Sequence, residues 1–495
     1  MLTRDGVRLD ADLYYPDAAG PFPVLLMRQP YGRAIASTVV YAHPIWYAAH
    51  GYLVVVQDVR GRGTSAGEFK LFANEINDGY DAVMWAADLP GSTGAIGMYG
   101  FSYQGMTQLY AAVNQPAPLK VICPAMVGYD LYTDWAYEGG AFCFQANLGW
   151  AIQLAAETAR LQGDTATHQT LAAAARNLTF GDSVPTRSGL LETLAPDSHY
   201  HEWLDHPEAG EFWDSLSPKT HLPNVDLPML HIGGWFDTYL RGTLALYQAM
   251  AARSVHRQQG VIGPWAHLPW ERKVGAVDFG PEAASPCDRL QIRWFDHFLK
   301  GIDTGLLNQP PLLLFEMGSN RWHSYDTWVS PPPTCFFLAS TGLASLDDRE
   351  GSLHPNPQPP RPTPDILIHD PWRPAPALGG HAAFPAGPYD RASLDCRTDI
   401  LTYTSQRLTA DLLLTGEAVA LIYCTADTPS FDLCAVLSEV HPTGNVYSFS
   451  QGYLRISSQQ STSPVRITLQ PTCICLKKGN ALRLSLSAAC FPAYP

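Results

Sequence analysis

Short apolar runs that alternate with helical patterns over the first 125 residues constrain the fold more than any other feature of the chain. The apolar runs lie at residues 24–27, 53–56, 95–99 and 120–123, and the helical stripes lie at residues 77–87 and 106–113. The first two runs are continuously apolar, which is typical of strands buried on both faces. Strands that alternate with helices in this way predict a parallel sheet with right-handed crossovers.

The pattern changes twice further along the chain, and each change predicts a new domain. Helical stripes dominate between residues 126 and 224, and strand-like runs at 229–232 and 260–262 then resume the sheet. Beyond residue 305, β-type runs follow one another with a proline-rich surface loop at 355–388 and no helix, which predicts an antiparallel sandwich. The expected domains are an α/β domain of residues 1–125 and 225–305, a helical insertion of residues 126–224, and a β-sandwich of residues 306–495.

Charge and cysteine content limit the partners and the compartment. The 495 residues include 46 Asp and Glu against 32 Lys and Arg, a formal net charge of −14. Nucleic acids and anionic membranes need a basic surface, so we expect neither as a partner. The sequence has no apolar run of the ~18 residues that span a membrane, and its first residues lack the apolar region of a signal peptide. Ten cysteines without a C-x-x-C pair predict free thiols and a cytoplasmic protein, and a homo-oligomer remains open.

The strongest local signal is the segment 97–105, Gly-Met-Tyr-Gly-Phe-Ser-Tyr-Gln-Gly, where a predicted strand ends and a helix begins at a serine. Such a sharp turn lifts the hydroxyl of Ser102 off the sheet, and small residues around it accommodate the crowded backbone. The helix behind it begins with unpaired N–H groups that can bind a developing oxyanion. The spacing is one residue longer than the general G-x-S-x-G motif, and a serine that only caps a helix is the alternative.

A serine nucleophile needs a base to take its proton and a carboxylate to orient that base. Asp237 follows the predicted strand at 229–232, and His267 follows the one at 260–262. Both residues therefore come at the carboxyl end of a strand, where open α/β sheets bind their ligands. The order Ser102, Asp237, His267 is that of α/β-hydrolases. A helix cap for Asp237 and an ordinary loop histidine for His267 are the alternatives.

At this point the chain resembles, over nearly its whole length, the cocaine-esterase and Xaa-Pro dipeptidyl-peptidase family of serine hydrolases. The matching segments are 4–9 (Arg-Asp-Gly-Val-Arg-Leu), 28–31 (Arg-Gln-Pro-Tyr), 57–61 (Gln-Asp-Val-Arg-Gly), 100–105, 234–237 (Gly-Trp-Phe-Asp), 263–267 (Gly-Pro-Trp-Ala-His) and 293–301. The longer serine turn is this family's own form. The resemblance implies an α/β-hydrolase domain with an inserted helical cap and a C-terminal jelly roll. The chain stops soon after residue 492, so we expect the jelly roll to lack its last strand.

The resemblance also implies an oxyanion hole. In this family a tyrosine after the first parallel strand supplies one donor, here the hydroxyl of Tyr31, and the backbone N–H of the residue after the nucleophile supplies the other, here Tyr103. A phenol can donate to an oxyanion without carrying a positive charge. Without the resemblance, Tyr31 would be read as a turn tyrosine after Pro30.

Three further interpretations concern neighbouring residues. Trp135, Trp150 and Tyr239 could line an acyl pocket or be ordinary core aromatics. The glycines between residues 61 and 67 lack the spacing of a dinucleotide-binding loop. Asp58 and Arg60 are read as a structural ion pair near the end of the sheet.

Together these features predict a serine hydrolase that cleaves an acyl ester or amide through an acyl-enzyme, without a metal or organic cofactor. Its expected partner is a small ester or a short peptide. A dipeptidyl-peptidase or an α-amino-acid ester hydrolase is the alternative, since Asp130, Asp134 or Glu138 could bind a free amino group. An inert hydrolase scaffold with a carbohydrate-binding jelly roll is the alternative of another class.

Overall fold

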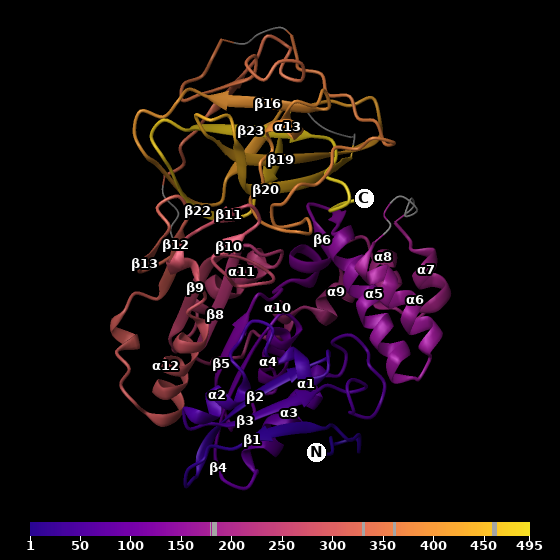
Figure 1. Ribbon diagram of the computed structural model, residues 1–495, viewed down its shortest axis with the longest axis vertical. Helices are drawn as coiled ribbons and strands as arrows, with labels where there is room; N and C mark the ends of the chain where they lie inside the picture. The colour runs from indigo at the N-terminus through magenta and orange to yellow at the C-terminus, as the bar shows by residue number, and fades with distance from the viewer. Residues whose placement is uncertain (179, 181–185, 329–331, 360–362, 458–462) are drawn as a thin grey trace.

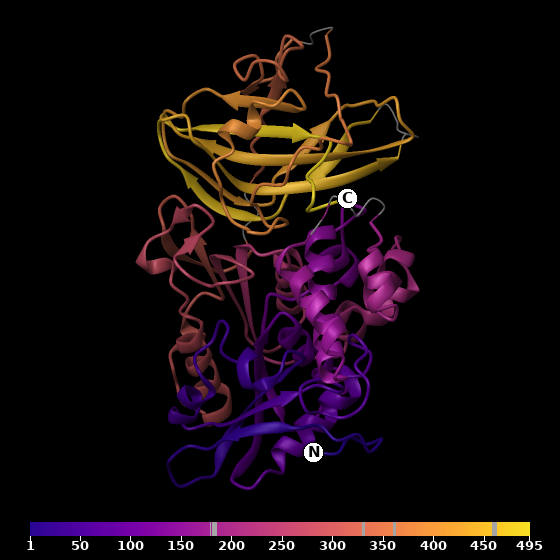
Figure 2. The same cartoon turned by 45° about the vertical axis from the view of Figure 1, so that its right-hand side comes forward.

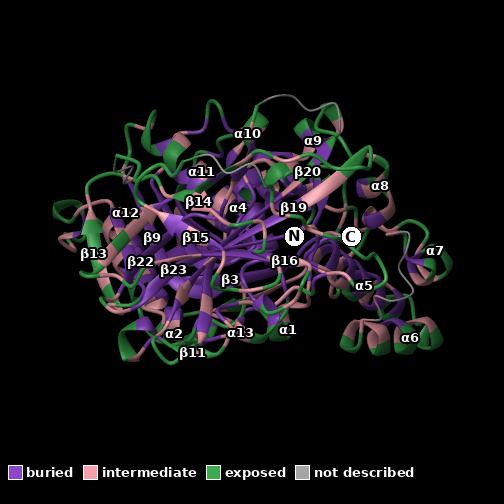
Figure 3. Ribbon diagram, turned by 90° about the horizontal axis from the view of Figure 1, so that it is seen from above, coloured by how far each residue is buried: buried purple, intermediate pink, exposed green. Residues whose placement is uncertain are grey.

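The computed structural model describes residues 1–178, 180, 186–328, 332–359, 363–457 and 463–495. Figures 1 and 2 show an α/β part that carries the N-terminus, a group of helices packed beside it, and a β-rich part at the end opposite the N-terminus. Figure 3 shows that buried residues concentrate in the strands at the centre, while exposed residues gather on the peripheral helices and loops.

The α/β part is built on a nine-stranded sheet, and the predicted parallel arrangement is confirmed. From β3 to β12 all neighbours pair in parallel, while β1 and β13 add antiparallel edges. The strand order is β1 (Ala11–Tyr14), β3 (Leu53–Asp58), β2 (Phe22–Gln29), β4 (Ser92–Phe101), β5 (Leu119–Ala125), β8 (Met229–Phe236), β9 (Gln258–Ala266), β12 (Leu312–Glu316) and β13 (Arg321–Tyr325).

The two faces of the sheet are covered by different helices, which explains the continuous apolar runs. Val24 and Leu26 of β2 pack in the core with α3 and α4, whereas Leu25 and Met27 pack in the core with α2 and α12. Successive side chains of a strand point to opposite faces, so a strand covered on both sides is apolar throughout. The helices of this part are α1 (Arg33–Ala36), α2 (Pro44–Ala49), α3 (Glu75–Ala87), α4 (Tyr103–Ala112), α11 (Leu240–Ala251), η2 (Pro281–Ala283), α12 (Cys287–Lys300) and η3 (Leu306–Asn308).

A helical insertion separates β5 from β8. It opens with a short π-helix and a two-stranded hairpin, and its helices α5, α6, α7 and α8 lie together at one side of the α/β part in Figure 1. The elements are η1 (Tyr132–Ala136), β6 (Tyr137–Glu138), β7 (Ala141–Phe142), α5 (Phe144–Leu161), α6 (Thr165–Arg176), α7 (Gly189–Leu194), α8 (His199–Asp205), α9 (Glu211–Leu216) and α10 (Pro218–His221).

The C-terminal part is rich in antiparallel strands. Inward-facing residues such as Ala435 and Leu484 of the six-stranded sheet share one core with Ile467 and Ile474 of the strand pairs, as in a sandwich. The six-stranded sheet has the order β14 (Phe337–Ala339), β15 (Ser352–His354), β16 (Ile400–Ser405), β23 (Ala481–Ser487), β19 (Ser430–Val440) and β20 (Val446–Ser457). The strand pairs are β17 (Leu412–Gly416) with β22 (Thr472–Leu476), and β18 (Val419–Ile422) with β21 (Val465–Thr468).

The structure corrects three expectations for the region after residue 305. β12 and β13 extend the first sheet, because Leu312 and Leu314 pair with β9 and are buried against it. β15 runs parallel to β16, so the sandwich is not wholly antiparallel. A short helix, α13 (Ala392–Asp395), also lies between the strands.

The proline-rich stretch 355–388 holds no helix or strand among its described residues, and residues 360–362 lie outside them. It is not purely a surface loop, however, because His381 and Ala382 are buried. The carbonyl of His381 accepts a hydrogen bond from Thr238 at 2.7 Å, and the Phe384 backbone exchanges hydrogen bonds with the Gln145 side chain. The stretch therefore links the C-terminal part to both the sheet and the insertion. A small hairpin of β10 (Lys273–Val274) and β11 (Val277–Asp278) adjoins it, through Ala276 and Pro388.

Candidate active site

Ser102 lies in a sharp turn between β4 and α4. Its backbone has φ +58° and ψ −129°, a left-handed conformation that costs free energy for a residue with a side chain. The turn is held by the Ser102 N–H, which donates to the carbonyl of Ala125 at 2.9 Å. A Cβ on Gly100 would come within 2.5 Å of Gln104 Cβ, and one on Gly105 within 2.4 Å of Val127 Cγ1. The glycine spacing around the serine therefore follows from the close packing of the turn.

The N-terminus of α4 lies directly behind the serine. Tyr103 is the first residue of this helix, so its N–H has no acceptor within the helix and adds to the positive end of the helix dipole. The Tyr103 side chain helps to fix the turn, because its buried hydroxyl donates a hydrogen bond to Glu75 at 2.8 Å. Glu75 in turn pairs with the buried Arg28 at 2.6 Å.

Asp237 and His267 lie side by side at the ends of β8 and β9. Phe236 pairs with Ala266 in the parallel ladder, so the residues that follow them leave the sheet at the same level. His267 Nδ1 is 2.8 Å from Asp237 Oδ1, and Asp237 is completely buried. The Asp237 side chain is not a helix cap, because α11 begins only at Leu240 and has Tyr239 at its N-cap. A carboxylate on Nδ1 leaves the opposite ring nitrogen to act as a base.

The His267 ring lies next to the serine turn. Its centroid is 5.5 Å from that of Phe101, the residue that precedes Ser102. On another side the Tyr239 ring contacts it edge-on at 5.0 Å. The sheet therefore brings Asp237 and His267 together, with the His267 ring beside the residue that precedes Ser102. Both Ser102 and His267 keep limited contact with solvent.

Tyr31 follows β2 in a turn fixed by buried polar groups. Its backbone N–H donates to Gln29 Oε1 at 2.8 Å, and Gln29 Nε2 donates to Asp58 at 2.8 Å. Its hydroxyl accepts a hydrogen bond from Trp150 Nε1 at 3.1 Å and lies beside the Ser102 hydroxyl. Burial raises the pKa of Tyr31 to about 12, so the phenol keeps its proton at neutral pH and remains a donor.

Aromatic side chains from the insertion and from the loop after Asp237 form one wall beside these groups. Trp135 packs on Tyr239 with 4.0 Å between ring centroids and on Trp150 with 5.4 Å. The three aromatic residues singled out in the sequence therefore lie together next to His267 and Tyr31. Trp150 also serves as the hydrogen-bond donor to Tyr31, a role that its sequence context did not indicate.

The ion pair expected between Asp58 and Arg60 is wrong. Asp58 instead pairs with Arg33, and Arg60 pairs with Asp5 and Asp78 on the far side of the loop. Asp58 is the last residue of β3 and accepts a hydrogen bond from Gln29 of β2. Because Gln29 also binds the Tyr31 backbone, Asp58 helps to fix the turn that carries Tyr31.

Two contacts from the C-terminal part reach the acid loop and could not be expected from sequence. Gln470 Nε2 donates to the carbonyl of Asp237 at 2.7 Å, and Thr238 donates to His381 as described above. These partners are more than 140 residues away in the chain, and no local pattern marks them.

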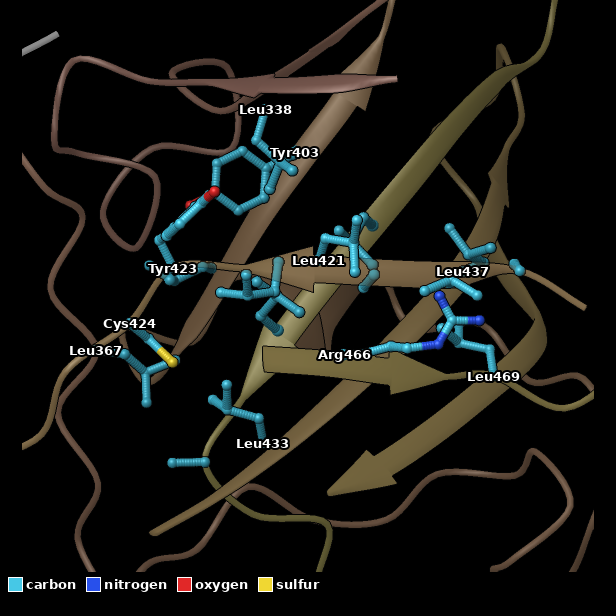
Figure 4. Close-up of a pocket in the computed structure, with 18 of the residues that line it drawn as sticks. Leu338, Leu367, Tyr403, Leu421, Tyr423, Cys424, Leu433, Leu437, Arg466 and Leu469 are labelled. Atoms are coloured by element: carbon cyan, nitrogen blue, oxygen red, sulfur yellow. The ribbon is translucent and has the colours of Figure 1, made fainter. Parts of the chain in front are cut away.

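A large cavity lies apart from these residues. It occupies about 3100 Å³ within the C-terminal part, and Figure 4 shows its leucines together with Tyr403, Tyr423 and Arg466. Ser102, Asp237 and His267 are not among its lining residues.

In the described part of the chain, no three His, Cys, Asp or Glu side chains come close enough to hold a metal ion. Nor does that part contain a helix long and apolar enough to cross a membrane.

Comparison with known proteins places the chain in a family. Residues 5–269 match the model of the X-Pro dipeptidyl-peptidase (S15) family, and residues 304–495 match its C-terminal non-catalytic domain. The chain is 31% identical to cocaine esterase from Rhodococcus sp. (strain MB1 Bresler), over 99% of this chain and 90% of that protein.

Solved structures agree on the fold. An aminopeptidase from a marine sediment Thaumarchaeota archaeon superposes with a TM-score of 0.79 at 22% identity, covering 100% of this chain and 88% of that one. An α-amino acid ester hydrolase superposes with a TM-score of 0.77 at 22% identity, covering 99% and 88%. The matches to both family models and to a relative over almost the entire chain show that this protein is a member of the X-Pro dipeptidyl-peptidase (S15) family of serine hydrolases.

Proposed function

We propose that the protein is a serine esterase that cleaves small acyl esters through an acyl-enzyme formed on Ser102. His267 takes the proton of the attacking hydroxyl and later returns it to the leaving alcohol, while Asp237 holds the imidazole in the required tautomer. The hydroxyl of Tyr31 and the N–H of Tyr103 stabilise the oxyanion. A water molecule then hydrolyses the acyl-enzyme by the same steps in reverse order.

The hydrogen bond of 2.8 Å between His267 Nδ1 and the buried Asp237 carries this proposal. A buried carboxylate on Nδ1 favours the tautomer whose Nε2 lone pair is free to accept a proton. The ring that carries this lone pair lies beside the strained turn of Ser102. The 31% identity to cocaine esterase supports an ester as the substrate.

The acidic residues that could bind a free amino group already interact with other groups of the protein. This favours an esterase over a peptidase that binds a free amino group. Glu138 is buried, and burial opposes its ionisation, but Arg241 and His381 outweigh this and hold the pKa of Glu138 below its usual range. Asp134 accepts the backbone N–H groups of Tyr129 and Asp130. Because these carboxylates already have partners inside the protein, neither is available to hold an ammonium group.

Asp130, the third candidate, is similarly engaged. It caps the turn at Tyr132 and lies 3.3 Å from Lys219. We therefore expect substrates without an α-amino group.

Initial rates on matched substrates test the proposal. The wild-type enzyme should hydrolyse 4-nitrophenyl acetate and butyrate, and dipeptide 4-nitroanilides should react at least 100-fold more slowly. Ser102→Ala should abolish the ester activity. An enzyme that prefers Xaa-Pro anilides to the esters would contradict the esterase assignment, and one that cleaves neither would favour the inert scaffold.

The cysteines support a reducing, cytoplasmic location. All ten are free thiols, and Cys434 and Cys490 lie close enough for their thiols to hydrogen-bond without being joined. Proteins of oxidising compartments generally join such pairs as disulfides. Titration of the denatured, anaerobically purified protein should give ten thiols, and fewer would contradict this location.

A further inference from the structure

A buried arginine without an acidic partner lies next to the candidate site. Arg62 is 2% exposed, and no carboxylate of the described residues comes within ion-pair distance of it. Its guanidinium donates one hydrogen bond, from Nη1 to the carbonyl of Leu154 at 3.2 Å, and its buried Nε has no partner among those residues. Glu157, which acts on Arg62 from further away, is bound to Arg160 through both carboxylate oxygens.

Arg62 faces the groups that surround the serine. Its guanidinium lies over the Phe69 ring at 3.8 Å, and Phe69 in turn contacts Tyr103. It is close enough to Tyr31 and to Tyr103 to interact with both electrostatically. Burial lowers the pKa of Arg62 to about 10, so the group remains a cation at neutral pH.

Two other buried polar atoms lie near Trp150, the residue that contacts Tyr31. The Trp135 ring is 5.4 Å from Trp150 and the His199 ring is 5.2 Å from it on another side. Trp135 Nε1 and His199 Nε2 are both buried and make no hydrogen bond to the described residues. Burial and then the charge of Arg62 lower the pKa of His199 to about 3, so this imidazole is neutral and Arg62 is the cation it faces.

Unpaired polar groups are costly inside a protein, so those of Trp135 and His199 beside Trp150, and of Arg62, which acts electrostatically on His199 and Tyr31, need a partner. They come from three elements: the loop after β3, the π-helix η1 and helix α8. A purely structural arginine would use most of its five donors on carbonyls or carboxylates of the chain, as Arg60 does with Asp5 and Asp78.

We propose that Arg62, with Trp135 and His199, forms a subsite that binds a carboxylate at the far end of the substrate's acyl group. The preferred substrates are then monoesters of short dicarboxylic acids. A guanidinium presents planar paired donors that match a carboxylate. Arg62 lies close enough to Tyr31 to act on its hydroxyl electrostatically, so the chain between the ester carbonyl and the terminal carboxylate is expected to be short. This inference rests on the esterase function proposed above.

The test compares two esters that differ only in the terminal charge: 4-nitrophenyl hydrogen glutarate and 4-nitrophenyl pentanoate. The wild-type enzyme should prefer the glutarate in kcat/KM by about 10- to 100-fold. Arg62→Met should abolish this preference. The ratio of the two rate constants is compared, so a general loss of activity in the variant cancels. Arg349→Met removes an exposed arginine of the C-terminal part and should leave the ratio unchanged.

The possible results distinguish failure of the carboxylate subsite from failure of the proposed esterase function. If pentanoate is hydrolysed but glutarate is not preferred, or if Arg62→Met keeps the preference, the subsite is wrong and the esterase stands. If neither ester reacts, the esterase assignment fails. If the Arg62→Met variant does not fold, a competition experiment on the wild-type enzyme tests the subsite instead. Free glutarate should then slow labelling of Ser102 by a neutral fluorophosphonate at least tenfold more effectively than free pentanoate. Equal protection by the two acids would refute the subsite.

Discussion

The indole N–H of Trp150 donates to the hydroxyl oxygen of Tyr31 at 3.1 Å. An oxygen that accepts this bond keeps its own hydrogen free to point elsewhere, and the Ser102 hydroxyl lies beside it. The helical insertion thus helps to orient the Tyr31 phenol toward Ser102, the proposed nucleophile, although the insertion itself carries none of the proposed triad. An oxyanion donor fixed in this way needs no reorganisation during the reaction.

Tyr31→Phe removes the donor and keeps the ring. It should lower kcat by about 10²–10³, or ~3–4 kcal/mol, with little change in KM, since the donor acts mainly where negative charge develops. Steady-state kinetics on an activated nitrophenyl ester measure both constants. The matched control is Tyr15→Phe, which removes the hydroxyl of an exposed tyrosine that donates a hydrogen bond to the carbonyl of Pro90. This variant should behave as wild type. A wild-type kcat for Tyr31→Phe would remove Tyr31 from the oxyanion hole.

The pKa of Tyr31 predicts how the enzyme behaves at high pH. Burial raises this pKa to about 12, so the phenol stays protonated well above pH 10, whereas an exposed tyrosine would be half ionised there. The rate of fluorophosphonate labelling should therefore not fall between pH 8.5 and 10.5. A loss of half the rate near pH 10 would indicate that the phenol ionises like that of an exposed tyrosine, and would contradict the raised pKa of Tyr31.

Asp237→Asn preserves the shape of the acid but places an amide beside His267 Nδ1. The amide favours the wrong imidazole tautomer, so kcat should fall by about 10⁴ while the protein still folds. Circular dichroism and thermal unfolding monitor the fold, and rates on nitrophenyl acetate give the loss. A reduction of less than tenfold would mean that another carboxylate orients His267.

Gln470 tests whether the C-terminal part positions the acid. Gln470→Leu removes the hydrogen bond to the carbonyl of Asp237, so we expect kcat to fall about tenfold with KM nearly unchanged and stability to fall by ~1–2 kcal/mol. Ser485→Ala, which removes a buried hydrogen bond to Asp395 far from the acid loop, should lose similar stability but keep kcat. Equal kcat values for the two variants would assign Gln470 a purely structural role.

Much of the catalytic part follows from sequence because its signals are local. The apolar runs that became β2 and β3 need both faces covered, and the glycines at 100 and 105 mark a turn in which a Cβ has no room. Asp237 and His267 could be placed together because each follows a strand of one parallel sheet, and Phe236 and Ala266 are indeed paired.

What could not be predicted depends on contacts between distant segments. The partner of Asp58 is Arg33 and not its near neighbour Arg60, because the buried end of β3 faces the turn after β2. The expected sandwich began at residue 306, and only the pairing of β12 with β9 assigns this segment to the first sheet. The division of the chain into three domains, and the roles of the site residues, remain predictions.

The central claim is that Ser102 is the nucleophile, and covalent labelling tests it most directly. The protein is treated with a fluorophosphonate, digested, and mapped by mass spectrometry. We predict one phosphonyl group per chain, carried by the peptide that contains Ser102, and no label in Ser102→Ala. Stoichiometric label on any other residue, or an unlabelled wild-type protein that still hydrolyses nitrophenyl esters, would contradict it.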